Sequence, residues 1–184
     1  MSISETNKTE ALPDNKNYLV REDFEATKGV FYAGQDNYAN LDRRNSFAGK
    51  SSMSVSLPSQ LNDFSLKVRM PEWDLKKYGT LSFAYLIPQS MPITLRVKTN
   101  FDEWVCLGKS GEADCPQIKN AIPVTLIDDG TWHEIKIDVR AAMQEMLPAL
   151  HSLQSVEFYF PRNRHAGDIL LIDDFNISGP KQNP

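Results

Sequence analysis

The sequence has no apolar run long enough to cross a bilayer and no hydrophobic signal core near its N-terminus. Basic residues do not gather into runs longer than the pairs Arg43-Arg44 and Lys76-Lys77, and the net charge is −4. These absences give no reason to expect membrane insertion or a nucleic-acid partner. With 184 residues, of which 41% are hydrophobic and 24% charged, the chain can form one globular domain with a sizeable core.

Motifs that carry catalysis are missing as well. No serine lies in a nucleophile elbow, no glycine-rich loop is built to hold a phosphate, and no HExxH zinc motif occurs. Paired carboxylates of the glycosidase kind need only meet in space, but acids such as Glu134 and Asp138 are better explained as solvated outward side chains of a strand. We therefore predict a protein that is not an enzyme.

Cysteine is scarce, with only Cys106 and Cys115, which enclose the polar, glycine-containing segment LGKSGEAD. A loop of this length allows its ends to meet, so the pair is compatible with a disulfide. Two free thiols are the alternative, whereas a zinc site lacks further ligands at suitable spacing. The disulfide is the favoured interpretation, and it indicates an extracellular, periplasmic or cell-envelope setting, although no targeting segment is visible in this chain.

Alternation of apolar and polar residues is the main pattern of the chain. It recurs in the segments 52–57, 64–68, 80–87, 93–98, 135–139 and 156–160. A period of two is typical of half-buried strands, and the connections are too short for the crossovers of a parallel sheet. Only the segment 140–147 is rich in helix formers, and Pro148 follows it. These patterns predict an all-β, antiparallel two-sheet β-sandwich with one short helix inserted near 140–147.

The two ends of the chain differ from this alternating region. Residues 1–17 are polar and show no periodicity, which predicts a flexible N-terminal lead-in. Residues 180–184 form a short C-terminal tail. The β-sandwich domain is therefore expected to span 18–179.

The last strand segment, LLIDDFNIS, places Asp173 and Asp174 side by side within an apolar run. A buried charge is costly unless it is paired, hydrogen-bonded or bound to a cation. Alternation turns one of two adjacent side chains toward solvent. For the other aspartate, three partners remain open: a cation, the backbone amides of the GKSS turn at 49–52, or Arg21.

Four segments together resemble a known family: DFE at 23–25, AGKSSMSVSL at 48–57, DGTWHEIKIDV at 129–139 and LLIDDFNIS at 170–178. They look like the galactose-binding-like β-jelly-roll modules, which include many carbohydrate-binding modules of bacterial polysaccharide-degrading enzymes. The resemblance implies a jelly-roll fold. It also implies a structural calcium joining the first strand, a glycine-containing loop and the last strand. Carried over to this chain, its ligands are Glu25, Asp173 or Asp174, and carbonyl oxygens around Lys50.

The same resemblance implies a polysaccharide or oligosaccharide ligand. An aromatic ring can cover the apolar face of a sugar while planar polar side chains bind its hydroxyl groups. Residues of these types that face outward by alternation, or lie at a strand end or in a loop, form the predicted ligand site: Tyr159, Trp104, Arg96, Glu157 and Trp73. For Trp104 and Trp73, packing in the core or over a sheet edge is the alternative.

Two functions remain in view. The leading hypothesis is a non-catalytic carbohydrate-binding module of a secreted or cell-envelope protein. The alternative is a structural or adhesion module that contacts other protein subunits in an extracellular assembly. The alternative has support because the outward strand faces are rich in Lys, Arg and Glu and poor in aromatic residues.

Overall fold

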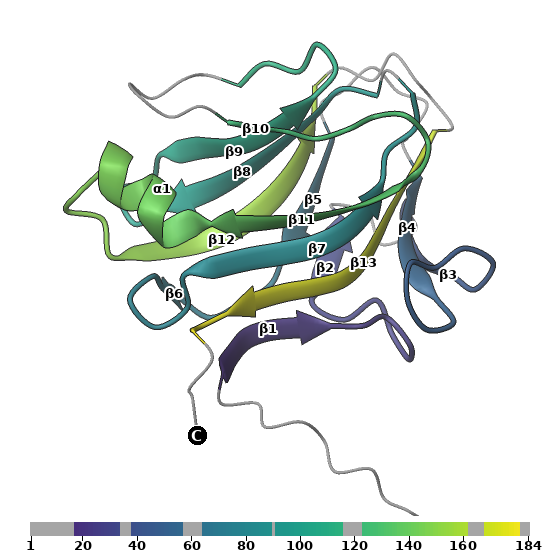
Figure 1. Cartoon of the computed structure of the whole chain (residues 1–184), viewed down its shortest axis with the longest axis horizontal. Coiled ribbons are helices and arrows are strands. Elements are labelled where there is room, and N and C mark those ends of the chain that lie inside the picture. The colour runs from purple at the N-terminus through teal and green to yellow at the C-terminus, as the bar shows by residue number, and fades with distance from the viewer. Residues whose placement is uncertain are drawn as a thin grey trace, which may run out of the picture.

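The computed structural model describes residues 17–33, 38–56, 64–89, 91–115, 123–161 and 168–180, which form two β-sheets packed against each other (Figure 1). Sheet A has the order β11 (Trp132–Asp138), β7 (Thr80–Leu86), β13 (Ile169–Ser178), β4 (Ser52–Ser56) and β3 (Ala39–Asp42), and β1 (Tyr18–Glu22) also pairs with β13. Sheet B has the order β10 (Val124–Thr125), β9 (Trp104–Ser110), β8 (Ile93–Thr99), β12 (Ser152–Phe160), β5 (Phe64–Val68) and β2 (Phe31–Ala33), with β6 (Trp73–Asp74) beside β12.

The strand pairing confirms the predicted antiparallel sandwich, with one exception. The short strand β10 runs parallel to β9, through the pairs Val124 with Gly108 and Thr125 with Lys109. The other strand pairs within the described ranges are antiparallel. A two-residue strand is too short to show alternation, so this parallel contact could not be predicted from the sequence.

Aromatic side chains fill the space between the sheets. Phe83 of sheet A meets Phe158 of sheet B edge to face, with ring centroids 5.3 Å apart. Phe175 of β13 and Phe31 of β2 make a second such contact across the core at 4.9 Å. All four residues are at most 2% exposed. Edge-to-face rings at these distances add to the stability gained from their buried area, so this cluster holds the two sheets together.

The helix α1 (Val139–Met146) follows β11 directly and confirms the predicted helix to within one residue. Asp138 caps its N-terminus, because the carboxylate Oδ1 accepts a hydrogen bond of 2.9 Å from the backbone N–H of Ala141. Val139 and Met143 are buried, so one face of the helix packs on the sandwich. Within the described ranges, no helix has the length and apolar character that a membrane crossing requires.

The first and last strands lie side by side, as Figure 1 shows for β1 and β13. Arg21 pairs with Asn176 and Glu22 with Phe175 in antiparallel register. The pairing of β13 with β7 shifts between Asp173 and Asn176. The predicted N-terminal lead-in and C-terminal tail lie outside the described residues, apart from Asn17 and Pro180.

Candidate functional site

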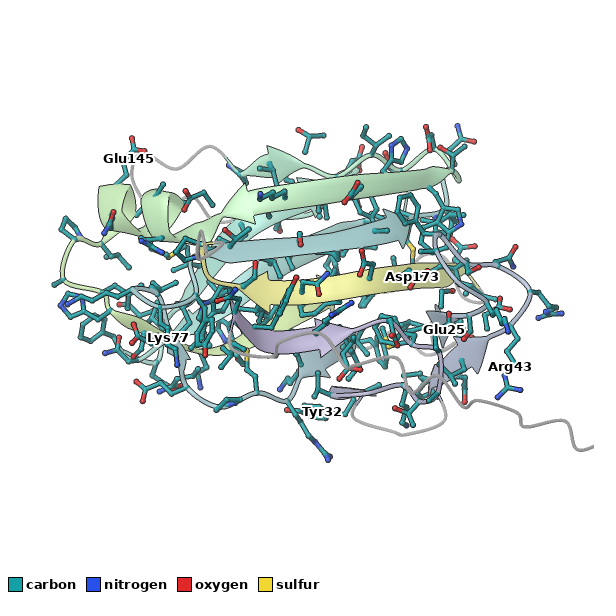
Figure 2. The ribbon with its side chains drawn as sticks, turned by 60° about the horizontal axis from the view of Figure 1, so that its bottom comes forward. Glu25, Tyr32, Arg43, Lys77, Glu145 and Asp173 are labelled. Carbon is teal, nitrogen blue, oxygen red and sulfur yellow. A yellow bond between two sulfur atoms is a disulfide. The ribbon has the colours of Figure 1, made fainter. Side chains whose placement is uncertain are left out.

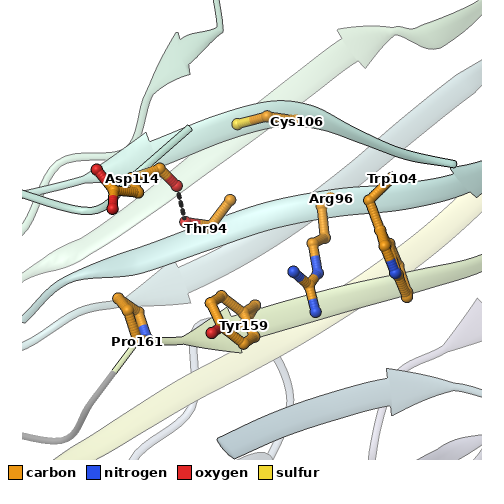
Figure 3. Close-up of a pocket in the computed structure, with 7 residues that line it drawn as sticks. All are labelled: Thr94, Arg96, Trp104, Cys106, Asp114, Tyr159 and Pro161. Carbon is orange, nitrogen blue, oxygen red and sulfur yellow. Dashed lines mark hydrogen bonds between the residues drawn. The ribbon is translucent and has the colours of Figure 1, made fainter. Parts of the chain in front are cut away.

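Three side chains on the outward face of sheet B stack on one another: Trp104 of β9, Arg96 of β8 and Tyr159 of β12 (Figure 3). The Arg96 Cζ atom lies 4.3 Å from the ring centroid of Trp104 and 3.9 Å from that of Tyr159. Distances this short place the guanidinium cation over both aromatic faces. Three of the five residues predicted to contact a ligand thus form one stack.

Strand register explains why the cation lies between the two rings. Tyr159 is opposite Thr94, two positions before Arg96, and Trp104 is opposite Lys98, two positions after it. Alternate residues of a strand share a face, so all these side chains point outward. The rings therefore approach Arg96 from opposite sides along β8.

An open pocket of about 180 Å³ lies beside this stack. Its lining includes Thr94, Arg96, Trp104, Cys106, Asp114 and Tyr159. The predicted disulfide between Cys106 and Cys115 is present, with the two Cα atoms 5.6 Å apart. The Thr94 hydroxyl donates a hydrogen bond of 2.8 Å to the carbonyl oxygen of Asp114. Together these two links hold Asp114 at the edge of the pocket.

Glu157 is buried, although it was expected to be exposed to a ligand. It lies on the outward side of β12, but it is only 2% exposed, and Arg96 Nε donates a hydrogen bond to its carboxylate. Lys67 of β5 lies on its other side, with Nζ 3.8 Å from Oε1. The expectation that Glu157 itself faces a ligand is therefore wrong in this structure. Its carboxylate instead orients the guanidinium that lines the pocket.

Trp73 does not belong to this site. Its side chain has no exposed surface, and its indole Nε1–H donates a hydrogen bond to the carbonyl oxygen of Tyr78. It lies on the short strand β6, where it pairs with Leu153 of β12. The expectation of a loop tryptophan at the surface was wrong because β6 places the indole ring in the core.

Asp173 of β13 is the buried member of the aspartate pair, at 1% exposure. Its Oδ2 accepts hydrogen bonds from the backbone N–H groups of Phe47, at 2.9 Å, and Ala48, at 3.0 Å. Its Oδ1 accepts a third, of 2.8 Å, from the N–H of Asp174. Burial raises the pKa of Asp173, and these three hydrogen bonds offset part of the rise.

Glu25 makes the matching contact a few residues further along the same loop. Its Oε1 accepts hydrogen bonds from the backbone N–H groups of Lys50, at 2.7 Å, and Ser51, at 3.2 Å. Gly49 permits this approach: its φ is +62°, and an added Cβ would lie 2.2 Å from Glu25 Oε1. Figure 2 shows Glu25 and Asp173 at the same end of the molecule.

The expected calcium ligands do not fit a calcium ion in this arrangement. Calcium requires a shell of oxygen atoms, but the loop presents N–H groups to both Glu25 and Asp173, including that of Lys50. Asp174 has a backbone φ of 45°, and its Oδ1 accepts a hydrogen bond from the side-chain amide of Asn176. Among the described residues, no cluster of three or more His, Cys, Asp or Glu side chains is placed to hold a metal.

Backbone amides therefore satisfy Asp173, which is one of the partners left open by the sequence. The amides differ slightly from those expected: the N–H groups of the GKSS turn serve Glu25, and the two residues before that turn serve Asp173. Arg21 is not the partner, because its guanidinium lies over the ring of Tyr18.

Three residues near the pocket were missed from the sequence: Lys67, Thr94 and Asp114. Lys67 and Thr94 follow from alternation only once their strands are known to flank β12, at Glu157 and Tyr159. Asp114 has a weak signal, since it precedes Cys115 and a disulfide to Cys106 must bring it close to β9.

Comparison with known proteins identifies the fold. No protein-family model matches the sequence, and no curated protein matches it. Among solved structures, the family 30 carbohydrate-binding module of a cellulosomal cellulase of Clostridium thermocellum superposes with a TM-score of 0.53 at 14% identity, over 84% of this chain and 94% of that chain. The C-terminal family 22 module of Clostridium thermocellum Xyn10B gives a TM-score of 0.52 at 11% identity, over 94% of this chain and 100% of that chain.

A third similar structure was solved with a sugar bound. It is the family 11 carbohydrate-binding module of Clostridium thermocellum, in complex with a β-1,3-1,4-mixed-linked tetrasaccharide, with a TM-score of 0.51 at 16% identity, over 91% of this chain and 97% of that chain. Identities this low establish the fold alone. The chain has the β-sandwich fold of the carbohydrate-binding modules, in agreement with the resemblance seen in its sequence.

Proposed function

We propose that the protein is a non-catalytic module that binds an oligosaccharide or a segment of polysaccharide on the outward face of sheet B. The observation that carries this proposal is the stack of Trp104, Arg96 and Tyr159 beside an open pocket. The likeness in fold to carbohydrate-binding modules supports it.

Each member of the stack has a distinct part in this mechanism. The indole and phenol rings give the C–H groups of a sugar an apolar surface to pack against. Arg96 supplies hydrogen-bond donors for sugar oxygens, and Asp114 supplies acceptors at the other end of the pocket. Glu157 and the two rings already hold the guanidinium in place, so binding loses little side-chain entropy there.

A glycan array followed by calorimetry on the best ligand tests this proposal. We expect Trp104→Ala and Tyr159→Ala each to weaken binding by about tenfold or more, because each removes a ring contact worth roughly 1–2 kcal/mol. Phe47→Ala is the matched control, since Phe47 is an exposed aromatic residue, at 43%, in the loop held by Asp173. Failure of the wild-type protein to bind any glycan would overturn the proposal.

We also propose an extracellular or cell-envelope location. The disulfide between Cys106 and Cys115 supports it, because such bonds persist in oxidising compartments and are rare where glutathione keeps thiols reduced. Thiol labelling of the protein in its native host, with and without prior reduction, tests this: labelling of both cysteines before reduction would contradict it.

One observation favours the alternative function, contact with another protein. Phe47 is 43% exposed and packs against the half-buried Trp132, with ring centroids 5.9 Å apart, and Ile127 is 46% exposed. Light scattering separates the two functions. Self-association that disappears in Phe47→Asp, together with no glycan binding, would replace the carbohydrate proposal with this one.

A further inference from the structure

We propose that the pocket prefers an acidic sugar, and that the carboxylate of a hexuronic acid docks against the free edge of Arg96. This inference rests on the proposed function and adds the chemical class of the ligand to it. Three features of the site carry it: the hydrogen bonding of Arg96, the charges around it, and the separation of Arg96 from Asp114.

Among the residues that the structure describes, the hydrogen bonding of Arg96 leaves its terminal groups available. Its Nε–H is used by Glu157, and no residue in the described ranges accepts a hydrogen bond from either Nη group. The side chain is nevertheless 23% exposed, so a ligand can reach it. These two –NH₂ groups, which have no acceptor among the described residues, are the donors that a ligand in the pocket can satisfy.

The stacked rings limit the direction from which a ligand can approach. Trp104 and Tyr159 lie over the guanidinium at 4.3 Å and 3.9 Å, so contact with its flat faces is already made within the protein. The edge that carries the Nη donors remains. A guanidinium edge matches the two oxygens of a carboxylate, which accept two parallel hydrogen bonds, whereas a single hydroxyl accepts fewer.

The local charge favours an anion at this end of the pocket. The buried carboxylate of Glu157 is shared by two cations, Arg96 and Lys67, so one positive charge remains in excess. The nearby Lys98 does not change this balance, because it is paired with Asp102. Low-dielectric ring surfaces on both sides strengthen the attraction between the excess charge and an incoming carboxylate.

Asp114 makes the two ends of the pocket different in charge. Figure 3 shows Asp114 at the opposite end from Arg96, with Thr94 between them. An anion at the Asp114 end would be repelled, whereas sugar hydroxyls there can donate to its carboxylate. The acidic group of the ligand therefore lies toward Arg96 and Lys67, and its neutral hydroxyls toward Asp114.

The test compares hexuronate trisaccharides with the same trisaccharides after reduction of their carboxyl groups to neutral alcohols. At low salt, we expect each acidic sugar that binds to have a Kd at least about tenfold lower than that of its reduced counterpart, as measured by calorimetry. The difference should shrink as salt is added, since screening acts on the exposed charge. The pairing isolates the carboxylate, because ring shape and linkage are unchanged.

Charge variants assign the preference to Arg96. Glu157→Gln still offers an oxygen to Arg96 Nε but removes the internal counter-charge, so the preference for the acidic sugar should widen. Adding Arg96→Gln to that variant leaves Lys67 as the one excess charge but removes the guanidinium edge, so the preference should fall below that of the wild type, without leaving a buried, unpaired carboxylate. Lys136→Gln is the control, because this exposed lysine of β11 lies on sheet A and its loss changes net charge equally.

The outcomes separate this inference from the proposed function. Equal affinity for acidic and reduced sugars overturns the acidic preference and leaves carbohydrate binding intact. A preference in the Arg96→Gln, Glu157→Gln double variant that is as large as that of the wild type overturns the role of Arg96. Absence of binding to every acidic and neutral sugar overturns both proposals together.

Discussion

The carboxylate of Asp173, on the last strand, binds the backbone N–H of Phe47, 126 residues earlier in the chain, at 2.9 Å. Glu25 binds the same loop through the N–H of Lys50 at 2.7 Å. Two acidic side chains thus hold one loop against the sandwich, at the place where the family resemblance implies a calcium ion. Each carboxylate has its hydrogen bonds from the protein itself.

We expect the thermal stability of the protein to be independent of calcium. A bound ion stabilises the folded state by mass action, so removing it must lower the midpoint of unfolding. Backbone N–H groups already bind Glu25 Oε1 and both carboxylate oxygens of Asp173, which a calcium ion would need as ligands. Calorimetric melting with excess chelator and with added calcium measures this. A clear drop in the midpoint with chelator would contradict the amide-based explanation.

The loop contact with Glu25 requires glycine at position 49. We expect Gly49→Ala to destabilise the fold by more than Gly130→Ala. Both glycines have positive φ, +62° and +78°, so both substitutions carry a backbone strain of roughly 1–2 kcal/mol. Only at Gly49 does the new methyl group collide with a side chain, Glu25, whereas at Gly130 it meets nothing within 4 Å. Urea denaturation of the two variants compares these effects, and equal losses would show that Glu25 yields freely.

The disulfide should support both stability and the pocket. We expect Cys106→Ser with Cys115→Ser to lower the free energy of unfolding by about 2–3 kcal/mol, since the bond closes a short loop in the unfolded chain. Ligand binding should also weaken, because Asp114 loses one of its two links to the strands. Urea unfolding and calorimetry test the two effects, with reduced wild-type protein as the control. Unchanged ligand affinity would remove Asp114 from the site.

Asp129 should remain ionised in strongly acidic solution. The hydrogen bonds from His133 and Thr131 lower its pKa to about 2. A lowered pKa means that the ionised carboxylate favours the folded state. This contribution is present above the ordinary value of 3.8 and is lost as pH falls toward 2. Because Asp129 is exposed, its effect on the free energy of unfolding is small. The pKa of Asp129 is therefore better measured directly, by following its carboxyl NMR signal as pH is lowered. We expect His133→Ala to raise the pKa of Asp129. An Asp129 pKa near 3.8 in the wild type would contradict this explanation.

The sandwich could be predicted because alternation reports directly which side of a strand is buried. The segment 156–160 shows this well, since Val156, Phe158 and Phe160 enter the core and Tyr159 faces out. The helix after Asp138 was equally visible from its composition. The parallel contact of β10 with β9 was not, because pairing between short segments depends on the whole fold.

The candidate site was predictable only in part. Alternation correctly placed Arg96 and Tyr159 on the outward face. Exposure also depends on side chains of neighbouring strands, and Lys67 and Arg96 on those strands flank Glu157. Trp73 shows the same limit, because nothing in its local sequence shows that a two-residue strand draws it into the core. The partners of Asp173 needed the path of a loop far away in sequence.

The N–H of Gly179 donates a hydrogen bond of 2.8 Å to the carbonyl oxygen of Asn17, so the beginning and the end of the β-sandwich domain lie next to each other. This point lies beside β1 and β13 in sheet A, whereas the ligand face is formed by β8, β9 and β12 of sheet B. A short peptide could therefore join the two ends, and new termini could be opened elsewhere, giving a circularly permuted protein. Attachment to a bead or a fusion partner through either end would leave the pocket accessible.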